Sequence, residues 1–239
     1  MVCPKLVRTY SISNAKGVYE LRVAIFDFDG TLYKEETFPL MMHYLKNHRS
    51  ESKRYRPFIA SLLPYYFLYK IKLLPEEKMK KRSMQAYAHS LHGLTKQEVN
   101  SFFNDLAKSM RTSFHPIVLS QLKKHQKNGD HTILISGAFE PLLTAAVAGL
   151  KFDTIIGTPI PFNENYVDKK KKIDHIQNKR KTEKIKALFR KENVDWQNST
   201  TYSDSISDLP ILQLVGTPVA VQPDKKLKQF AEKYNWKMI

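Results

Sequence analysis

The sequence is poor in cysteine, since Cys3 is the one thiol among 239 residues. An intramolecular disulfide is therefore impossible, and a metal site built from several cysteines is excluded. A chain without structural disulfides fits a reducing compartment, so we expect a cytoplasmic protein.

Long hydrophobic runs are also missing. Residues 1–20 are mixed polar residues with no apolar stretch, so we expect no signal peptide and assign this leader no function. The longest apolar run in the first half, residues 62–74, is interrupted by Pro64, Lys70 and Lys72. It is too short and too charged to span a bilayer.

Acidic residues are few relative to basic ones. The 23 Asp and Glu stand against 39 Lys and Arg, which gives a formal net charge of +16. This balance indicates an anionic partner, such as a phosphorylated metabolite, an acidic lipid surface or nucleic acid, although general solubility would also account for it. Hydrophobic residues make up 42% and aromatic residues 11%, enough for a packed core.

Strand and helix patterns alternate along most of the chain. Strands are expected at 21–26, 131–135, 152–157, 199–202 and 217–221, and helices at 117–126, 139–149, 181–191, 208–214 and 224–234. This alternation predicts right-handed βαβ units, and so an α/β fold with a Rossmann-like parallel sheet and helices on both faces. The turn-rich segment 158–174, with lysines at 169–172, is expected to form an exposed hairpin.

Residues 37–112 show no strand pattern. Thr37 is the expected N-cap of a first helix, and Thr95 with Glu98 forms the expected capping box of a later one. We therefore predict an all-helical cap over residues 37–112, inserted into an α/β catalytic core made of residues 1–36 and 113–239.

The most informative stretch is the end of the first strand. Four apolar residues precede Asp27 and Asp29, whose side chains point the same way while the chain stays extended. Gly30 then lets the backbone turn and approach a ligand closely. In isolation this pattern is more often a polar strand end with an Asx-type turn.

Later segments change that interpretation. Ser136 ends the second strand, a basic helix begins near Lys181, and Asp204 and Asp208 follow a further strand. In a parallel sheet these strand ends meet at one edge. Clustered carboxylates repel one another unless a cation lies among them, and oxygen ligands favour Mg²⁺, which also binds substrate phosphate. One carboxylate could then attack phosphorus while a neighbour moves protons.

Three motifs in this order resemble the haloacid dehalogenase (HAD) superfamily of phosphohydrolases. They are Asp27 to Thr31 (Asp-Phe-Asp-Gly-Thr), the hydrophobic strand that ends at Ser136, and the acid pair Asp204 and Asp208. The resemblance covers about residues 22–224. It is closest to the phosphoserine-phosphatase-like branch (subfamily IB), which has a helical C1-type cap. Each motif alone is weak, but the set is specific.

The resemblance implies a role for each acid. Asp27 is the nucleophile that forms an aspartyl-phosphate, and Asp29 protonates the leaving oxygen and then activates water. Mg²⁺ is held by the Asp27 carboxylate, the Asp29 backbone carbonyl and Asp204. Asp208 lies behind them and orients ligands or a lysine.

The resemblance also implies a phosphate and substrate site. Ser136 and the backbone N–H of Gly137 would bind phosphate oxygens. The charge-neutralising lysine is Lys181, with Lys184 as the rival. Glu36 matches the glutamate that contacts the substrate amino group in phosphoserine phosphatases, while a helix-start acid is an equal alternative.

The expected function is therefore a Mg²⁺-dependent phosphatase acting on a small phosphomonoester, with no nucleic-acid partner. A phosphomutase shares both aspartates and stays possible. A phosphatase of lipid head groups is an alternative, because the aromatic run at 65–69 with Lys70 and Lys72 could rest on an anionic membrane surface. The third alternative is a basic module that binds nucleic acid or anionic lipid and uses the HAD fold as a scaffold.

Overall fold

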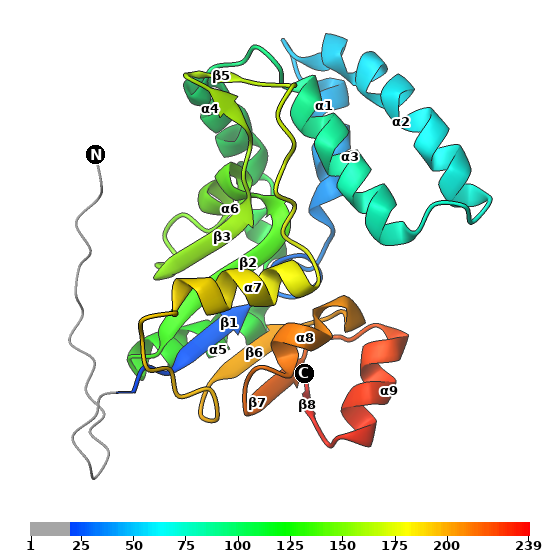
Figure 1. The fold of residues 1–239 in the computed structure, drawn as a ribbon. Helices are drawn as coiled ribbons and strands as arrows, with labels where there is room; N and C mark the ends of the chain where they lie inside the picture. The colour runs from blue at the N-terminus through cyan, green and yellow to red at the C-terminus, as the bar shows by residue number, and fades with distance from the viewer. Residues whose placement is uncertain (1–19) are drawn as a thin grey trace.

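The computed structural model describes residues 20–239, so Cys3 and the expectations for the leader at 1–19 lie outside it. A six-stranded sheet forms the centre, in the order β3-β2-β1-β6-β7-β8, and every neighbouring pair is parallel (Figure 1). The strands are β1 (Val23–Phe26), β2 (His131–Phe139), β3 (Thr154–Thr158), β6 (Thr200–Ser203), β7 (Thr217–Ala220) and β8 (Lys237–Met238). The predicted α/β fold with a parallel sheet is confirmed.

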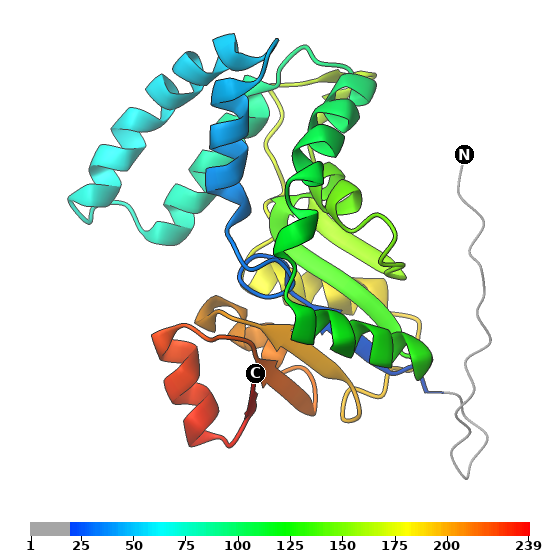
Figure 2. The ribbon, with the colours of Figure 1, turned by 180° about the vertical axis from the view of Figure 1, so that it is seen from behind.

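Helices cover both faces of the sheet. In Figure 1 α7 lies in front of the strands, and in Figure 2, seen from behind, α5 lies in front of them. The helices of the described chain are α1 (Thr37–Asn47), α2 (Tyr55–Lys70), α3 (Glu76–Ser90), α4 (Lys96–Lys108), α5 (Pro116–Lys127), α6 (Glu140–Ala146), α7 (Lys179–Leu188), α8 (Leu209–Leu212) and α9 (Lys225–Lys233).

β1 is buried on both faces, as its unbroken apolar sequence predicts. Ile25 packs with Ile185 of α7 in one apolar cluster, while Phe26 packs with Leu122 of α5 in another. The Phe26 ring stacks on Tyr202 of β6 with a centroid distance of 4.6 Å. This packing fixes the strand whose end carries Asp27.

The helical segment α1–α4 follows β1 and shares the apolar cluster of the sheet. Phe103 of α4 contacts Phe139 at the end of β2, with ring centroids 5.9 Å apart. The capping box of α4 is confirmed, with the Thr95 and Glu98 side chains bonded to each other's backbone N–H. The division into core and cap at residues 37 and 112 stays a prediction.

Three local features differ from the sequence expectations. β2 continues to Phe139, so Ser136 lies within the strand. Thr37 is the first residue of α1, and Glu36 occupies the N-cap position with an extended backbone. The Thr37 N–H donates a hydrogen bond to Asp29 in place of an N-cap side chain. The short edge strand β8 carries no pattern that would have predicted it.

A hairpin forms within residues 158–174 as predicted, from β4 (Phe162–Asn163) and β5 (Tyr166–Val167). Its side facing the helical segment is not exposed. Val167 is buried and exchanges backbone hydrogen bonds with Gly93 and Leu94, at 3.3 and 2.9 Å. The hairpin therefore ties the second half of the chain to the turn before α4.

Across residues 20–239 no helix combines the length and the apolar character needed to cross a membrane.

Candidate active site

The site lies where the connections of the sheet change direction. β1 connects to β2 on one side, whereas the chain reaches β6 on its other side only after β3. In open α/β sheets ligands bind at such a switch point, outside the carboxyl ends of the strands. A cavity of about 850 Å³ opens there, lined by residues of the sheet edge and of α1–α3.

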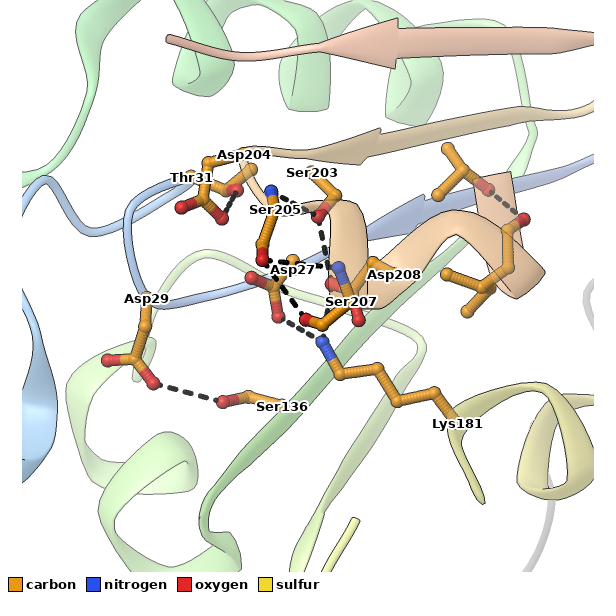
Figure 3. Close-up of polar contacts among 12 residues, drawn as sticks. Asp27, Asp29, Thr31, Ser136, Lys181, Ser203, Asp204, Ser205, Ser207 and Asp208 are labelled. Atoms are coloured by element: carbon orange, nitrogen blue, oxygen red, sulfur yellow. Dashed lines mark hydrogen bonds and ion pairs between the residues drawn. The ribbon is translucent and has the colours of Figure 1, made fainter. Parts of the chain in front are cut away.

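Asp27 follows β1 and is buried against the start of α7. Lys181 Nζ donates to Asp27 Oδ1 at 2.6 Å and to Asp208 Oδ2 at 2.7 Å (Figure 3). Burial raises the pKa of Asp27 well above its ordinary value, against the opposing effect of Lys181. Burial lowers the pKa of Lys181, but the Asp208 and Asp27 carboxylates outweigh it and hold that pKa above its ordinary value.

Asp208 holds Lys181 in place by accepting its second hydrogen bond. Its Oδ2 also accepts a hydrogen bond from Ser203 Oγ at 2.8 Å, and its side chain is only 2% exposed. Because Ser203 and Lys181 both donate to the same Asp208 oxygen, the ammonium of Lys181 is held where it also reaches Asp27.

Lys184, the rival lysine, points elsewhere. Its Nζ lies 2.7 Å from Asp174 Oδ2, a carboxylate that also pairs with Arg180. The hydrogen bonds from Arg180 hold the pKa of Asp174 low, at about 2. The structure thus brings Lys181, and not Lys184, to the strand-end acids.

Asp29 lies at the N-terminus of α1. Its Oδ1 accepts from the Thr37 N–H at 2.7 Å, and its Oδ2 accepts from Thr37 Oγ1 at 3.2 Å and from Ser136 Oγ at 3.4 Å. Burial raises the pKa of Asp29 to about 7, and the charge of Glu36 adds to the rise. A carboxyl group with a pKa near neutrality can both donate and accept a proton.

Asp204 follows β6 and faces the turn after β1. Its Oδ1 accepts from Thr31 Oγ1 at 3.2 Å, and burial raises its pKa to about 6. Gly30 has a φ of +71°, and a Cβ there would overlap the Asp204 carboxylate. Glycine is therefore needed both for the turn and for the close approach of this acid.

The donors present fit Mg²⁺. Burial raises the pKa values of Asp27 and Asp204, and the charge of Asp208 adds to the rise at both, while the charge of Asp204 also adds to it at Asp27. A cation between these carboxylates would relieve that repulsion. Residues 20–239 hold no cluster of three or more His, Cys, Asp or Glu side chains arranged as a metal site. The expected set needs only two carboxylates with the Asp29 carbonyl, and Mg²⁺ commonly completes its shell with water and phosphate oxygens.

Ser136 and Gly137 lie on β2 next to Asp29. Ser136 Oγ accepts from the Ala138 N–H at 3.0 Å, which fixes the side chain. A Cβ on Gly137 would lie 3.1 Å from His175 Nε2 and 3.2 Å from the Ile176 carbonyl oxygen. The backbone at Gly137 is thus held close to the segment before α7.

Glu36 is exposed and lines the cavity from the N-cap position of α1. From the same side Lys80 of α3 lines it, paired with Glu76 at 2.9 Å. The predicted substrate residue therefore lies at the cavity.

From the sequence, Thr31 is given no role, although it ends the first motif, and Ser203 and His175 are not predicted. Thr31 and Ser203 are short hydroxyl residues beside the acids, and their positions next to Gly30 and Asp204 could have indicated them. His175 lines the cavity, and its Nδ1 has no hydrogen-bond partner within the described chain. Burial and nearby lysines lower its pKa to about 4, so the ring is neutral at pH 7. No sequence signal indicated it.

Comparisons with known proteins agree with this arrangement. The sequence model described as haloacid dehalogenase-like hydrolase matches residues 24–213. A histidinol-phosphatase of Neisseria meningitidis serogroup C is 26% identical over 237 residues, which cover 91% of this chain and 97% of that protein.

Two solved structures share the fold. A protein of unknown function from Bordetella pertussis Tohama I has a TM-score of 0.76 at 17% identity, covering 92% of this chain and 99% of that one. A phospho-aspartyl intermediate analogue of phosphoserine phosphatase has a TM-score of 0.57 at 15% identity, covering 88% and 91%. The chain described here is an enzyme that belongs to the haloacid dehalogenase-like hydrolase family and is related to its phosphatases.

Proposed function

We propose that this chain is a Mg²⁺-dependent phosphatase that hydrolyses a small phosphomonoester through an aspartyl-phosphate on Asp27. The observation that carries the proposal is the placement of Asp27 at the cavity, bonded to Lys181 and beside an acid whose pKa is near 7. The similarity to a histidinol-phosphatase over nearly its whole length supports it.

In the first step an Asp27 carboxylate oxygen attacks phosphorus, and the bond from phosphorus to the leaving oxygen breaks. Asp29 donates a proton to that oxygen, which its raised pKa allows near neutral pH. Lys181 and Ser136 would hold the phosphoryl oxygens, and when Mg²⁺ is bound it supplies positive charge against the transferring group. This set of roles predicts an alcohol product and a phosphorylated Asp27.

In the second step Asp29 takes a proton from water, whose oxygen attacks the phosphorus of the aspartyl-phosphate. The bond between phosphorus and the Asp27 oxygen breaks, which releases inorganic phosphate and restores the carboxylate. Because Thr37 and Ser136 fix the Asp29 side chain, the same carboxyl group serves both steps.

We further propose that residues 37–112 act as a cap on a core made of residues 1–36 and 113–239. Side chains of α1–α3, including Phe38, Tyr69 and Lys80, face the strand-end acids across the cavity. A helical segment in this place can exclude water during attack and admit substrate when it moves. The exposed acid Glu36 is proposed to meet a cationic group on the substrate, such as an amine.

The test is Mg²⁺-dependent phosphate release across phosphoserine, histidinol phosphate, sugar phosphates and nucleotides. Asp27→Asn should lower turnover more than about 1,000-fold, because the nucleophile is lost while the shape is kept. Asp105→Asn, a change of the same kind on the exposed face of α4, is the matched control. Acid-quenched reactions with labelled substrate should trap the label on Asp27.

Full turnover by Asp27→Asn would remove Asp27 as the nucleophile. Unchanged activity in EDTA would contradict the Mg²⁺ site. Labelled Asp27 with transfer to a second hydroxyl of the substrate, in place of release, would identify a phosphomutase.

A further inference from the structure

Exposed apolar side chains are concentrated at one end of the helical segment. Leu63, Phe67 and Leu73 are 58%, 64% and 71% exposed. In the described part of the chain, six of the eleven exposed large hydrophobic side chains lie between residues 63 and 73, and they are Leu63, Tyr66, Phe67, Leu68, Ile71 and Leu73. We call this region, on α2 and the turn to α3, the α2–α3 tip.

The tip exists because α2 is apolar on two sides. Phe58 and Leu62 point inward and are 2% and 7% exposed. Leu63, Phe67 and Ile71 recur every four residues and form a separate stripe that faces solvent. A helix with a second apolar stripe leaves that stripe without a partner inside the fold.

Basic residues outnumber acidic ones along α2 and the first half of α3, and two of them lie at the exposed turn. Between Lys53 and Arg82 the sequence has nine Lys and Arg but two acids, Glu76 and Glu77. Lys70 and Lys72 flank the apolar side chains of the turn itself and are exposed. The tip therefore combines apolar surface with positive charge, which together match an anionic partner that also has an apolar layer.

The turn that carries these residues is closed by backbone hydrogen bonds. Leu73 N–H bonds to the Leu68 carbonyl at 2.9 Å, and Lys72 has a φ of +61°. A positive φ is adopted more readily by glycine or asparagine, so the turn conformation does not account for lysine at this position. The hydrogen-bonded turn holds Lys72 and Leu73 together at the end of the hairpin.

We propose that the α2–α3 tip docks this protein on an anionic lipid membrane surface. The apolar side chains would enter the boundary between head groups and acyl chains, and the lysines would pair with anionic head groups. A second copy of the chain is disfavoured as the occupant, because two such tips would bring like charges together. Nucleic acid would use the lysines but not the aliphatic residues.

The tip is continuous with a wall of the cavity. Tyr69 on α2 lines the cavity, as do Glu76 and Lys80 at the start of α3 (Figures 1 and 2 show this hairpin projecting from the sheet). Docking by the tip would therefore bring the cavity close to the bilayer. This inference goes beyond the proposed phosphatase and does not depend on Asp27.

The experiment is co-sedimentation of the Asp27→Asn protein with vesicles of phosphatidylcholine alone or mixed with phosphatidylglycerol. Two double variants test the tip: Phe67→Ser with Leu73→Ser, and Lys70→Glu with Lys72→Glu. Their controls are Ile117→Ser, on an exposed apolar residue of α5, and Lys123→Glu with Lys127→Glu, on the same helix. α5 lies far from the tip in both ribbon views.

We expect the protein to bind vesicles that contain phosphatidylglycerol. Its affinity for vesicles of phosphatidylcholine alone should be at least tenfold lower. Each tip variant should weaken binding by about tenfold or more, and each control by less than about threefold. Because the protein used is catalytically inactive by design, a failed phosphatase assay would leave this result unaffected.

Three results would overturn the proposal. One is the absence of vesicle binding. Another is an equal loss of binding in the α5 charge control, which would assign binding to net charge alone. The last is a dimer that the Phe67→Ser with Leu73→Ser variant converts to monomer while vesicle binding is unchanged, which would make a second copy the occupant.

Discussion

Because Gly30 has no side chain, the Asp204 carboxylate can lie against the turn after β1. Gly30→Ala should raise the Mg²⁺ concentration for half-maximal activity at least tenfold, because the added Cβ overlaps that carboxylate. Gly129→Ala is the matched control, since Gly129 has a similar φ of +75° but nothing within 4 Å of the added Cβ. Both changes should cost about 1–2 kcal/mol of folding stability.

The measurement is a Mg²⁺ titration of activity for the two variants, beside urea denaturation of each. An equal Mg²⁺ requirement in Gly30→Ala and Gly129→Ala would mean that Gly30 serves the turn and not the position of Asp204.

Lys181 and Lys184 lie about one turn apart on α7 and have different partners. Lys181 is buried between two acids, whereas Lys184 is partly exposed beside Asp174. Lys181→Met leaves Asp27 and Asp208 buried without their cation, which should cost about 3–5 kcal/mol and remove activity. Lys184→Met removes a partly exposed pair with Asp174 and should cost less than about 1 kcal/mol. Denaturation curves and turnover of both variants measure this, and similar losses in the two would contradict the geometry.

The strand pattern predicts the acids directly, whereas Lys181 is predicted only through the family resemblance and with Lys184 as a rival. Asp27, Asp29 and Asp204 follow strands whose apolar patterns are clear, so their convergence follows from the parallel sheet alone. The lysine depends on where α7 starts, and that is set by an irregular segment ending at Asn178, whose φ is +50°. His175 comes from the same segment, which is why no pattern indicated it.

At the scale of elements, the helices of segment 37–108 differ in how firmly they are held. α4 buries five residues, including Phe103 against Phe139, whereas the sixteen residues of α2 bury only Phe58 and Leu62. Backbone amides in elements with few buried contacts open at lower free energy. We therefore expect amide hydrogen exchange in α2 to be at least tenfold faster than in α4.

Exchange read out by mass spectrometry on peptides of the two helices tests this difference. Peptides from α5, which packs directly on the sheet, give the reference for a firmly held helix. Slower exchange in α2 than in α4 would mean that α2 has a partner that the folded chain itself does not provide.

Elements with regular patterns could be predicted from the sequence, and those set by tertiary pairing could not. The apolar run at 131–135 marked β2, but its extension to Phe139 depends on pairing with Thr158 of β3. β8 has only two residues and forms because Lys237 pairs with Val219. In both places the neighbouring strand, and not local propensity, determines the structure.

For the whole molecule, the sign of the charge differs between surface and site. The chain carries a formal charge of +16, yet the strand ends at the cavity carry Asp27, Asp29, Asp204 and Asp208. The basic surface can draw in an anionic substrate, while the acids need a cation before a phosphate can approach them. We therefore expect folding stability to depend on the proposed divalent metal.

Mg²⁺ should therefore raise the melting temperature of the whole protein. A ligand that binds only the folded state at 100 times its dissociation constant adds about 2.7 kcal/mol of stability. For a chain of this size that corresponds to roughly 5–10 °C. Asp204→Asn removes one of the two carboxylates proposed to hold the ion, so its melting temperature should hardly respond to Mg²⁺. Thermal melts with MgCl₂, and with NaCl at equal ionic strength, separate this effect from salt screening. An equal shift in both salts would contradict a Mg²⁺ site at the end of β1 and β6.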